Sequence, residues 1–175
     1  MILSVHFIAG SAITKLIPNK LIAYPLAFLS HFLLDALPHT DYPIKGISAG
    51  WKKQNFYESV SSLVLDLLFG IASIIILAMA FDNFDIKAAL IGGFLGILPD
   101  FLCFVAYSLH NKNFLLFIKG RPLTEFEEFK TKTQNLYYRF HHFMHYKHNK
   151  NESSISLGIL TQLIIFLISS IILVK

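Results

Sequence analysis

Long apolar runs separated by polar turns dominate this chain of 175 residues. A membrane-spanning helix needs about 20 mostly apolar residues, and five runs come near that length: residues 2–17, 21–37, 60–81, 86–109 and 155–174. The last run is the clearest, because Gln162 is its only strongly polar residue. The first is the shortest, so it predicts either a tilted fifth span or a re-entrant segment. We therefore expect an all-α fold, an integral membrane helical bundle with four or five spans.

Polar residues gather in the connecting segments, of which 110–153 is by far the longest. Within it, apolar residues recur at steps of three and four between residues 124 and 149, which is typical of an amphipathic helix. Thr124 and Glu127 at its start fit a capping box. We expect a single membrane-embedded domain, 1–175, with an amphipathic helix within 122–150 that lies on the bundle or on the membrane surface.

Composition and charge assign the sides of the membrane. Only 15% of the residues are charged and 54% are hydrophobic, whereas soluble domains carry about 25% charged residues. If all five runs cross, the N-terminus, loop 38–57 and segment 110–153 share one side and hold eleven of the fifteen Lys and Arg residues. Basic loops stay in the cytoplasm, so we place the amphipathic helix there. Glutamates interleave with these basic residues, and we expect no nucleic-acid partner.

Five ionisable residues lie in or near the apolar runs: His6, His31, Asp35, Asp66 and Asp100. A charge at the centre of a membrane costs about 2.5–3.5 kcal/mol or more, so such groups need a partner or a water-filled cavity. The runs contain no Lys or Arg at these depths that could pair with the carboxylates. Metal ions, histidines or protons are the partners that remain. The single cysteine, Cys103, excludes a cysteine-based metal cluster.

Spacing and depth indicate that these groups meet. His31 and Asp35 are four residues apart and therefore share one helix face. Gly92, Gly96 and Asp100 form a stripe with the same step, and small residues let another helix approach closely. At a rise of 1.5 Å per residue, all five ionisable groups fall within roughly 15 Å of the cytoplasmic face. We expect one site that opens to the cytoplasm.

The segment 140–148 adds histidines on the same side, and on a helix His141, His145 and His148 form a row. One interpretation is a solvated His-rich face. The other assigns a ligand or acid–base role to His141 and His145, which lie nearest the apolar stripe. The expected metal ligands are then His6, His31, Asp35, Asp66, Asp100 and His141, and the expected catalytic residues are Asp35, His141 and His145.

A mixed His/Asp set without cysteine suits a divalent metal, with zinc favoured and manganese or iron as alternatives. Six candidate ligands exceed one tetrahedral site, so one or two ions are expected. Two metals about 3.5–4 Å apart clamp the attacking and leaving oxygens in phosphoester hydrolysis. A site at the lipid boundary favours membrane lipids as neighbours and a lipid-like or lipid-linked phosphoester as substrate.

The early His6, the glycine-rich helix and Leu98-Pro99-Asp100 resemble the LexA-regulated inner-membrane metal-dependent hydrolase family. His141 to His145 stands where that family has a His-Arg-Gly-x-Thr-His motif, and Phe101 and Leu102 replace its second Asp. The His31-x-x-x-Asp35 pair is similar to the zinc motif of zinc-dependent phospholipase C and P1-type nucleases. The resemblance implies a metal-dependent hydrolase in the inner (plasma) membrane of a prokaryote.

Two other functions fit the same residues. Intramembrane carboxylates and histidines also build ion or proton transport pathways, although here the outer half of the bundle looks dry. A non-catalytic membrane protein with a structural metal site is the third possibility.

Overall fold

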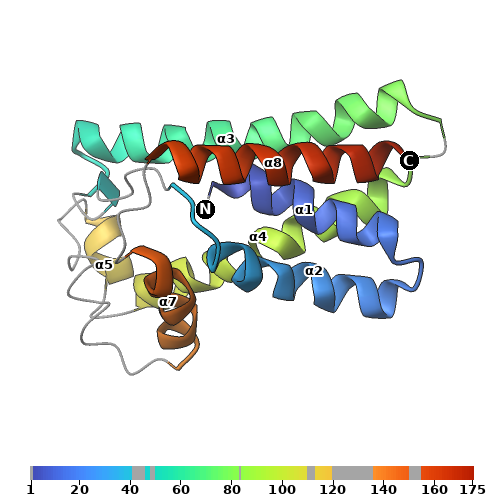
Figure 1. Ribbon diagram of the computed structural model, residues 1–175. Helices are drawn as coiled ribbons and strands as arrows, with labels where there is room; N and C mark the ends of the chain where they lie inside the picture. Colours follow the sequence, from blue (N-terminus) through green and yellow to red (C-terminus); the bar gives the residue numbers. More distant parts are fainter. Residues whose placement is uncertain are drawn as a thin grey trace.

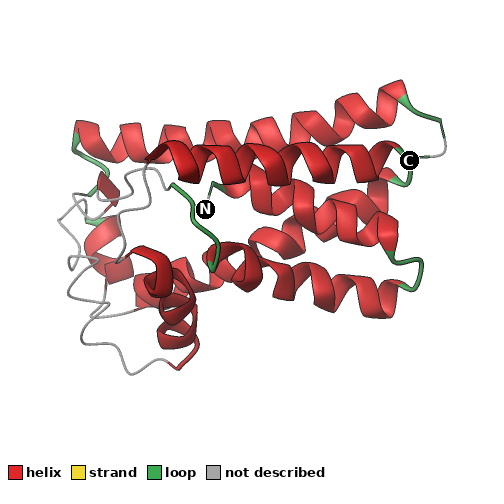
Figure 2. Ribbon diagram, viewed as in Figure 1, coloured by secondary structure: helices red, strands yellow, loops and turns green. Residues whose placement is uncertain are grey.

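The computed structural model describes residues 2–40, 46–47, 50–82, 84–109, 113–119, 136–149 and 155–175. This part of the chain is helical and contains no strand (Figures 1 and 2). The helices are α1 (Leu3–Leu16), α2 (Lys20–Asp35), α3 (Gln54–Ala80), α4 (Ile86–Leu109), α5 (Asn113–Ile118), α7 (Leu136–Asn149) and α8 (Ile155–Val174). The expected all-α fold is confirmed.

Three of the described helices, α3, α4 and α8, are long and apolar enough to cross a membrane, and α1 is a shorter apolar helix. The total of four or five spans remains a prediction. The expected bounds of the runs at 86–109 and 155–174 are those of α4 and α8. By contrast, α3 begins at Gln54, inside the loop expected at 38–57, because hydropathy marks the apolar part of a helix and not its polar first turns. Only 136–149 of the expected amphipathic helix lies within the described residues.

Helix α1 occupies the middle of the bundle and packs against α2, α3, α4 and α8. In Figure 1, α3 and α8 run along one side of it and α2 and α4 along the other. The short helices α5 and α7 gather at the end of the bundle where α3 begins and α4 ends, and α7 contacts both α2 and α4. This end also receives the ends of α2 and α4 that carry Asp35 and Asp100.

Glycines let α1 and α4 approach at backbone distance, as their spacing predicts. A Cβ atom added to Gly96 would lie 2.5 Å from the carbonyl oxygen of His6, and one added to Gly10 would collide with the carbonyl oxygen of Gly92. Hydroxyl groups join the same two helices, since Ser11 Oγ donates to the carbonyl of Ala89 at 2.7 Å. The contact sets the position of His6, on α1, relative to α4.

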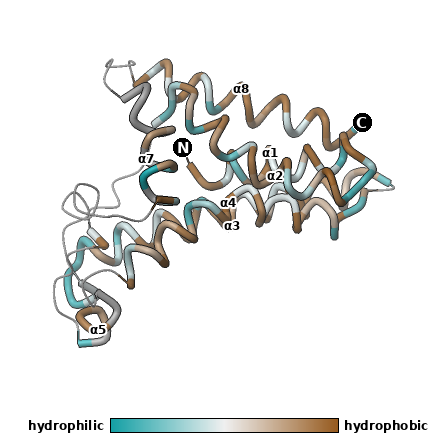
Figure 3. The backbone as a smooth tube through the Cα atoms, turned by 90° about the horizontal axis from the view of Figure 1, so that it is seen from below, coloured by the Kyte–Doolittle hydropathy of each residue, from teal (hydrophilic) through white to brown (hydrophobic). Residues whose placement is uncertain are grey.

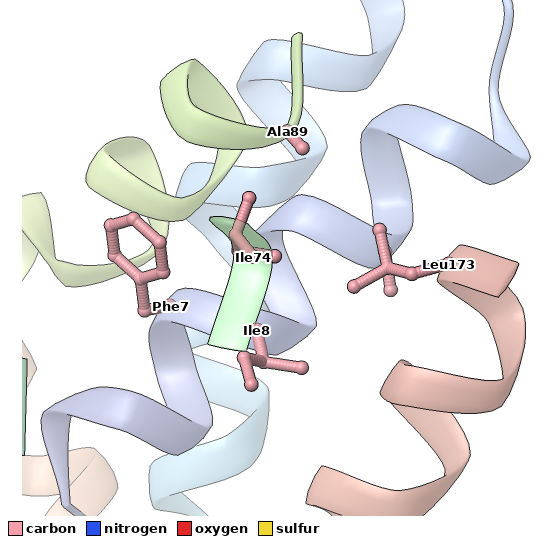
Figure 4. Close-up of a cluster of buried hydrophobic side chains, with 6 residues drawn as sticks. Phe7, Ile8, Ile74, Ala89 and Leu173 are labelled. Carbon is pink, nitrogen blue, oxygen red and sulfur yellow. The ribbon is translucent and has the colours of Figure 1, made fainter. Parts of the chain in front are cut away.

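The hydrophobic core lies beyond this contact, where α1, α3, α4 and α8 meet. Figure 4 shows Phe7, Ile8, Ile74, Ala89 and Leu173 converging there. Large apolar side chains also cover the outer surfaces of α3 and α8, as the hydropathy colouring of Figure 3 indicates. Exposed apolar surface of this extent is typical of a membrane interaction.

Candidate metal centre

Four metal-binding side chains converge at the α7 end of the bundle. His31 and Asp35 come from α2, Asp100 from α4 and His141 from α7. One ligand atom from each lies within 4.8 Å of every other. The four residues, called the His/Asp cluster below, could therefore hold a metal ion.

The cluster has the dimensions of a tetrahedral site. His31 Nε2 lies 2.9 Å from Asp35 Oδ2, 3.5 Å from Asp100 Oδ1 and 3.0 Å from His141 Nε2. His141 Nε2 lies 3.3 Å from Asp100 Oδ1 and 3.8 Å from Asp35 Oδ2. Zinc bonds to nitrogen and oxygen ligands are about 2.0–2.1 Å long, so tetrahedral ligand atoms stand about 3.3–3.4 Å apart. The observed separations centre on this value.

The ring of His31 is oriented for ligation. Its Nδ1 lies 2.9 Å from the carbonyl oxygen of Gly96, and because a carbonyl can only accept, Nδ1 carries the proton. In the neutral ring the lone pair is then on Nε2, which faces the cluster. A histidine ligand that donates its other N–H to a backbone carbonyl is the usual arrangement around protein-bound metals.

Burial makes the two carboxylates dependent on positive charge. The side chains of His31 and Asp35 are fully buried and that of His141 is 8% exposed, whereas that of Asp100 is 33% exposed. Two carboxylates close together in a low-dielectric environment repel each other and need protons or a cation. The cluster is thus closed on the α2 side and open at Asp100.

His6 lies beside the cluster and contacts two of its members. Its Nε2 donates to Asp35 Oδ1 at 3.0 Å, and its ring stacks on that of His31 with 4.1 Å between centroids. The two oxygens of Asp35 thus have different partners, His6 for Oδ1 and His31 for Oδ2. His6, which the sequence indicates as a ligand, is here placed to orient the carboxylate of Asp35.

Asp66 does not belong to the His/Asp cluster. Its Oδ2 accepts a hydrogen bond from the backbone N–H of Ser4 at 3.0 Å. Ser4 lies in the first turn of α1, where backbone N–H groups lack partners within the helix and a negative charge is favourable. The carboxylate on α3 thereby stabilises the N-terminus of α1.

His145 lies on α7, but its side chain is outside the described part of the structure, as are those of His142 and His148. His110 is likewise outside the described residues. The predicted acid–base role of His145 therefore stays a prediction.

An aromatic wall that sequence reasoning missed holds α7 against α2. The ring of Phe32, next to His31, contacts Phe140 with 5.1 Å and His141 with 5.9 Å between centroids. Tyr137 packs on Phe32 as well, and its hydroxyl donates to the carbonyl of Pro99 at 3.0 Å. Phe140 and Tyr137 lie on the expected amphipathic helix, but nothing in the sequence indicates which partner their rings meet.

No known protein-family model, curated protein or solved structure matches this chain. The resemblance to the inner-membrane hydrolase family therefore rests on its motif residues alone. The functional argument below depends on the geometry of the His/Asp cluster.

Proposed function

We propose that this chain is a membrane-embedded metal-dependent hydrolase that cleaves phosphoester bonds in lipid or lipid-linked substrates. The observation that carries the proposal is the convergence of four ligand atoms from three helices at tetrahedral spacing, with one member open to the outside. Apolar helices long enough to cross a membrane surround the cluster, which supports a substrate that arrives from the lipid.

His31, Asp35 and His141 are the residues that hold the metal in this proposal, and zinc fits their spacing best. A bound divalent metal lowers the pKa of water and polarises a phosphoryl oxygen. Asp100 has the exposed carboxylate and lies 3.3 Å from His141 and 3.5 Å from His31. It is suited to move aside as a ligand and to accept a proton from the attacking water. His145, one turn beyond His141, is the predicted general acid.

The buried side of the cluster keeps its shape during this chemistry. His6 orients the carboxylate of Asp35 through its Nε2–H, and the carbonyl of Gly96 orients the ring of His31. The Phe32 ring covers His31 and His141 and keeps water away from that side. Catalytic zinc sites commonly have three protein ligands and one open position, which Asp100 provides here. By the distribution of basic residues, this open side faces the cytoplasm.

Metal analysis of the detergent-purified protein tests the proposal. We expect one zinc ion per chain in the wild type, loss of that ion in Asp35→Ala, and retention in Asp82→Ala, which changes an exposed carboxylate outside the cluster. The wild type should release phosphate or a headgroup from a panel of phosphoester lipids. A wild-type protein that contains no stoichiometric transition metal contradicts the proposal.

A structural metal site is the second candidate, because four protein ligands can complete a tetrahedron by themselves, as in structural zinc sites. Asp100→Asn separates the two functions. In a hydrolase this variant keeps its metal and loses turnover. In a structural site it loses metal or stability, and the wild type turns over none of the phosphoesters.

A further inference from the structure

A hydrogen bond outside the His/Asp cluster joins the two helices that bring its more exposed members together. The hydroxyl of Tyr137, on α7, donates to the carbonyl of Pro99, on α4, at 3.0 Å. A carbonyl oxygen has two lone pairs, so Pro99 can accept from Tyr137 and from its own helix at once. This side-chain contact ties α7 to the backbone of α4.

The bond lies next to ligands on both helices. Pro99 directly precedes Asp100, and Tyr137 precedes His141 by four residues, which places Tyr137 and His141 on one face of α7. The two rings are 6.4 Å apart between centroids. A shift of α7 along α4 would therefore alter the 3.3 Å separation of His141 Nε2 and Asp100 Oδ1 and stretch the Tyr137 bond together.

The other contacts that dock α7 are less directional. Phe32 packs on Phe140 and on Tyr137 with centroid distances of 5.1 and 6.3 Å. Hydrophobic contacts of this kind are non-directional, whereas a hydrogen bond weakens steeply with misalignment. Burial raises the pKa of the Tyr137 phenol, so the hydroxyl keeps its proton near neutral pH and remains a donor.

We propose that Tyr137 is a positioning residue of the metal centre, whose hydroxyl fixes the register of α7 on α4 and thereby the spacing of His141 and Asp100. The inference rests on the proposed metal site and adds a residue that touches no metal. Tyr137 controls how tightly the site binds its metal, while the fold of the metal-free protein does not depend on it.

The test compares Tyr137→Phe, which removes only the hydroxyl, with the wild type and two other variants. Phe32→Leu loosens the packing of α7 and leaves the hydroxyl in place, and Tyr57→Phe removes a hydroxyl from an exposed tyrosine on α3. The Kd for Zn²⁺ is measured in detergent by competition with a chromogenic chelator, and the melting temperature is measured without metal.

We expect the Kd of Tyr137→Phe to rise about tenfold, at the lower end of the effect of residues that orient metal ligands. Phe32→Leu should raise it less, Tyr57→Phe should leave it unchanged, and metal-free Tyr137→Phe should melt near the wild type. An unchanged Kd, an equal loss in Phe32→Leu, or failure of metal-free Tyr137→Phe to fold would each overturn the role of Tyr137. If His141→Ala also binds zinc like the wild type, the proposed metal site itself is wrong.

Discussion

At the scale of single residues, Asp35 is the centre of the site. Its two oxygens are divided between His6 on α1 and His31 on its own helix, at 3.0 and 2.9 Å. Oδ2 also faces His141 on α7 at 3.8 Å. One carboxylate thus links three helices, and a hydrogen bond from His6 to one oxygen leaves the other directed at the ligand nitrogens.

His6→Asn tests whether His6 orients Asp35 or ligates the metal. As an orienting residue its loss should weaken Zn²⁺ binding about 10–100-fold, and saturating zinc should still load one ion per chain. Isothermal titration and metal analysis of the same sample measure the two quantities. A variant that cannot be loaded at any zinc concentration would show that His6 is an obligatory ligand.

At the scale of helices, the site depends on how closely α1 and α4 approach. The close contact at Gly96 serves two purposes, because it admits the backbone of His6 and presents a carbonyl to His31 Nδ1. A side chain at this position would push α1 outward and carry His6 away from Asp35. Packing at the centre of the bundle is thereby coupled to the geometry of the ligands.

Gly96→Ala should destabilise the protein by about 1–3 kcal/mol, as overpacking in a tight core does, and should weaken zinc binding as well. Gly70→Ala is the matched control, because its added Cβ would lie 3.2 Å from the nearest heavy atom, the Cα of Ser4. Thermal melting and Zn²⁺ competition measure the two effects. Equal losses in the two variants would contradict a special role for the α1–α4 contact.

The sequence predicts the long helices well, because apolar runs such as 86–109 end at polar residues where the helices end. It also selects the four members of the His/Asp cluster, since ionisable groups in apolar runs are rare and costly. It does not distinguish His6 and Asp66 from the ligands. All six are polar groups at similar depth, and only the rotation of each helix in the bundle decides which atoms meet. Tyr137 escapes for the same reason, because its partner is a backbone carbonyl.

At the scale of the whole molecule, the cluster connects α7 to the membrane bundle. Three of the four cluster residues lie on α2 and α4, and His141 alone comes from α7. A metal in the cluster would therefore join α7 to the bundle through His141. Its binding free energy would add to the stability of the whole fold.

Addition of zinc should raise the melting temperature of the metal-free protein, because a ligand at 100 times its Kd stabilises the folded state by about 2.7 kcal/mol. His141→Ala should show little or no rise, and Asp82→Ala should respond like the wild type. Differential scanning fluorimetry in detergent, with and without a chelator, measures the shift. A full zinc response in His141→Ala would separate α7 from the metal.

The separation of the ligands along the chain has a consequence for how the protein is made. His31 and His141 are 110 residues apart, so a ribosome delivers α2 long before α7. Until then the carboxylate and imidazole of α2 enter the bilayer without their later partners, in a helix that is not among those long and apolar enough to insert unaided. Loading of the metal must therefore be a late step in biogenesis, completed only when nearly the whole chain has left the translocon.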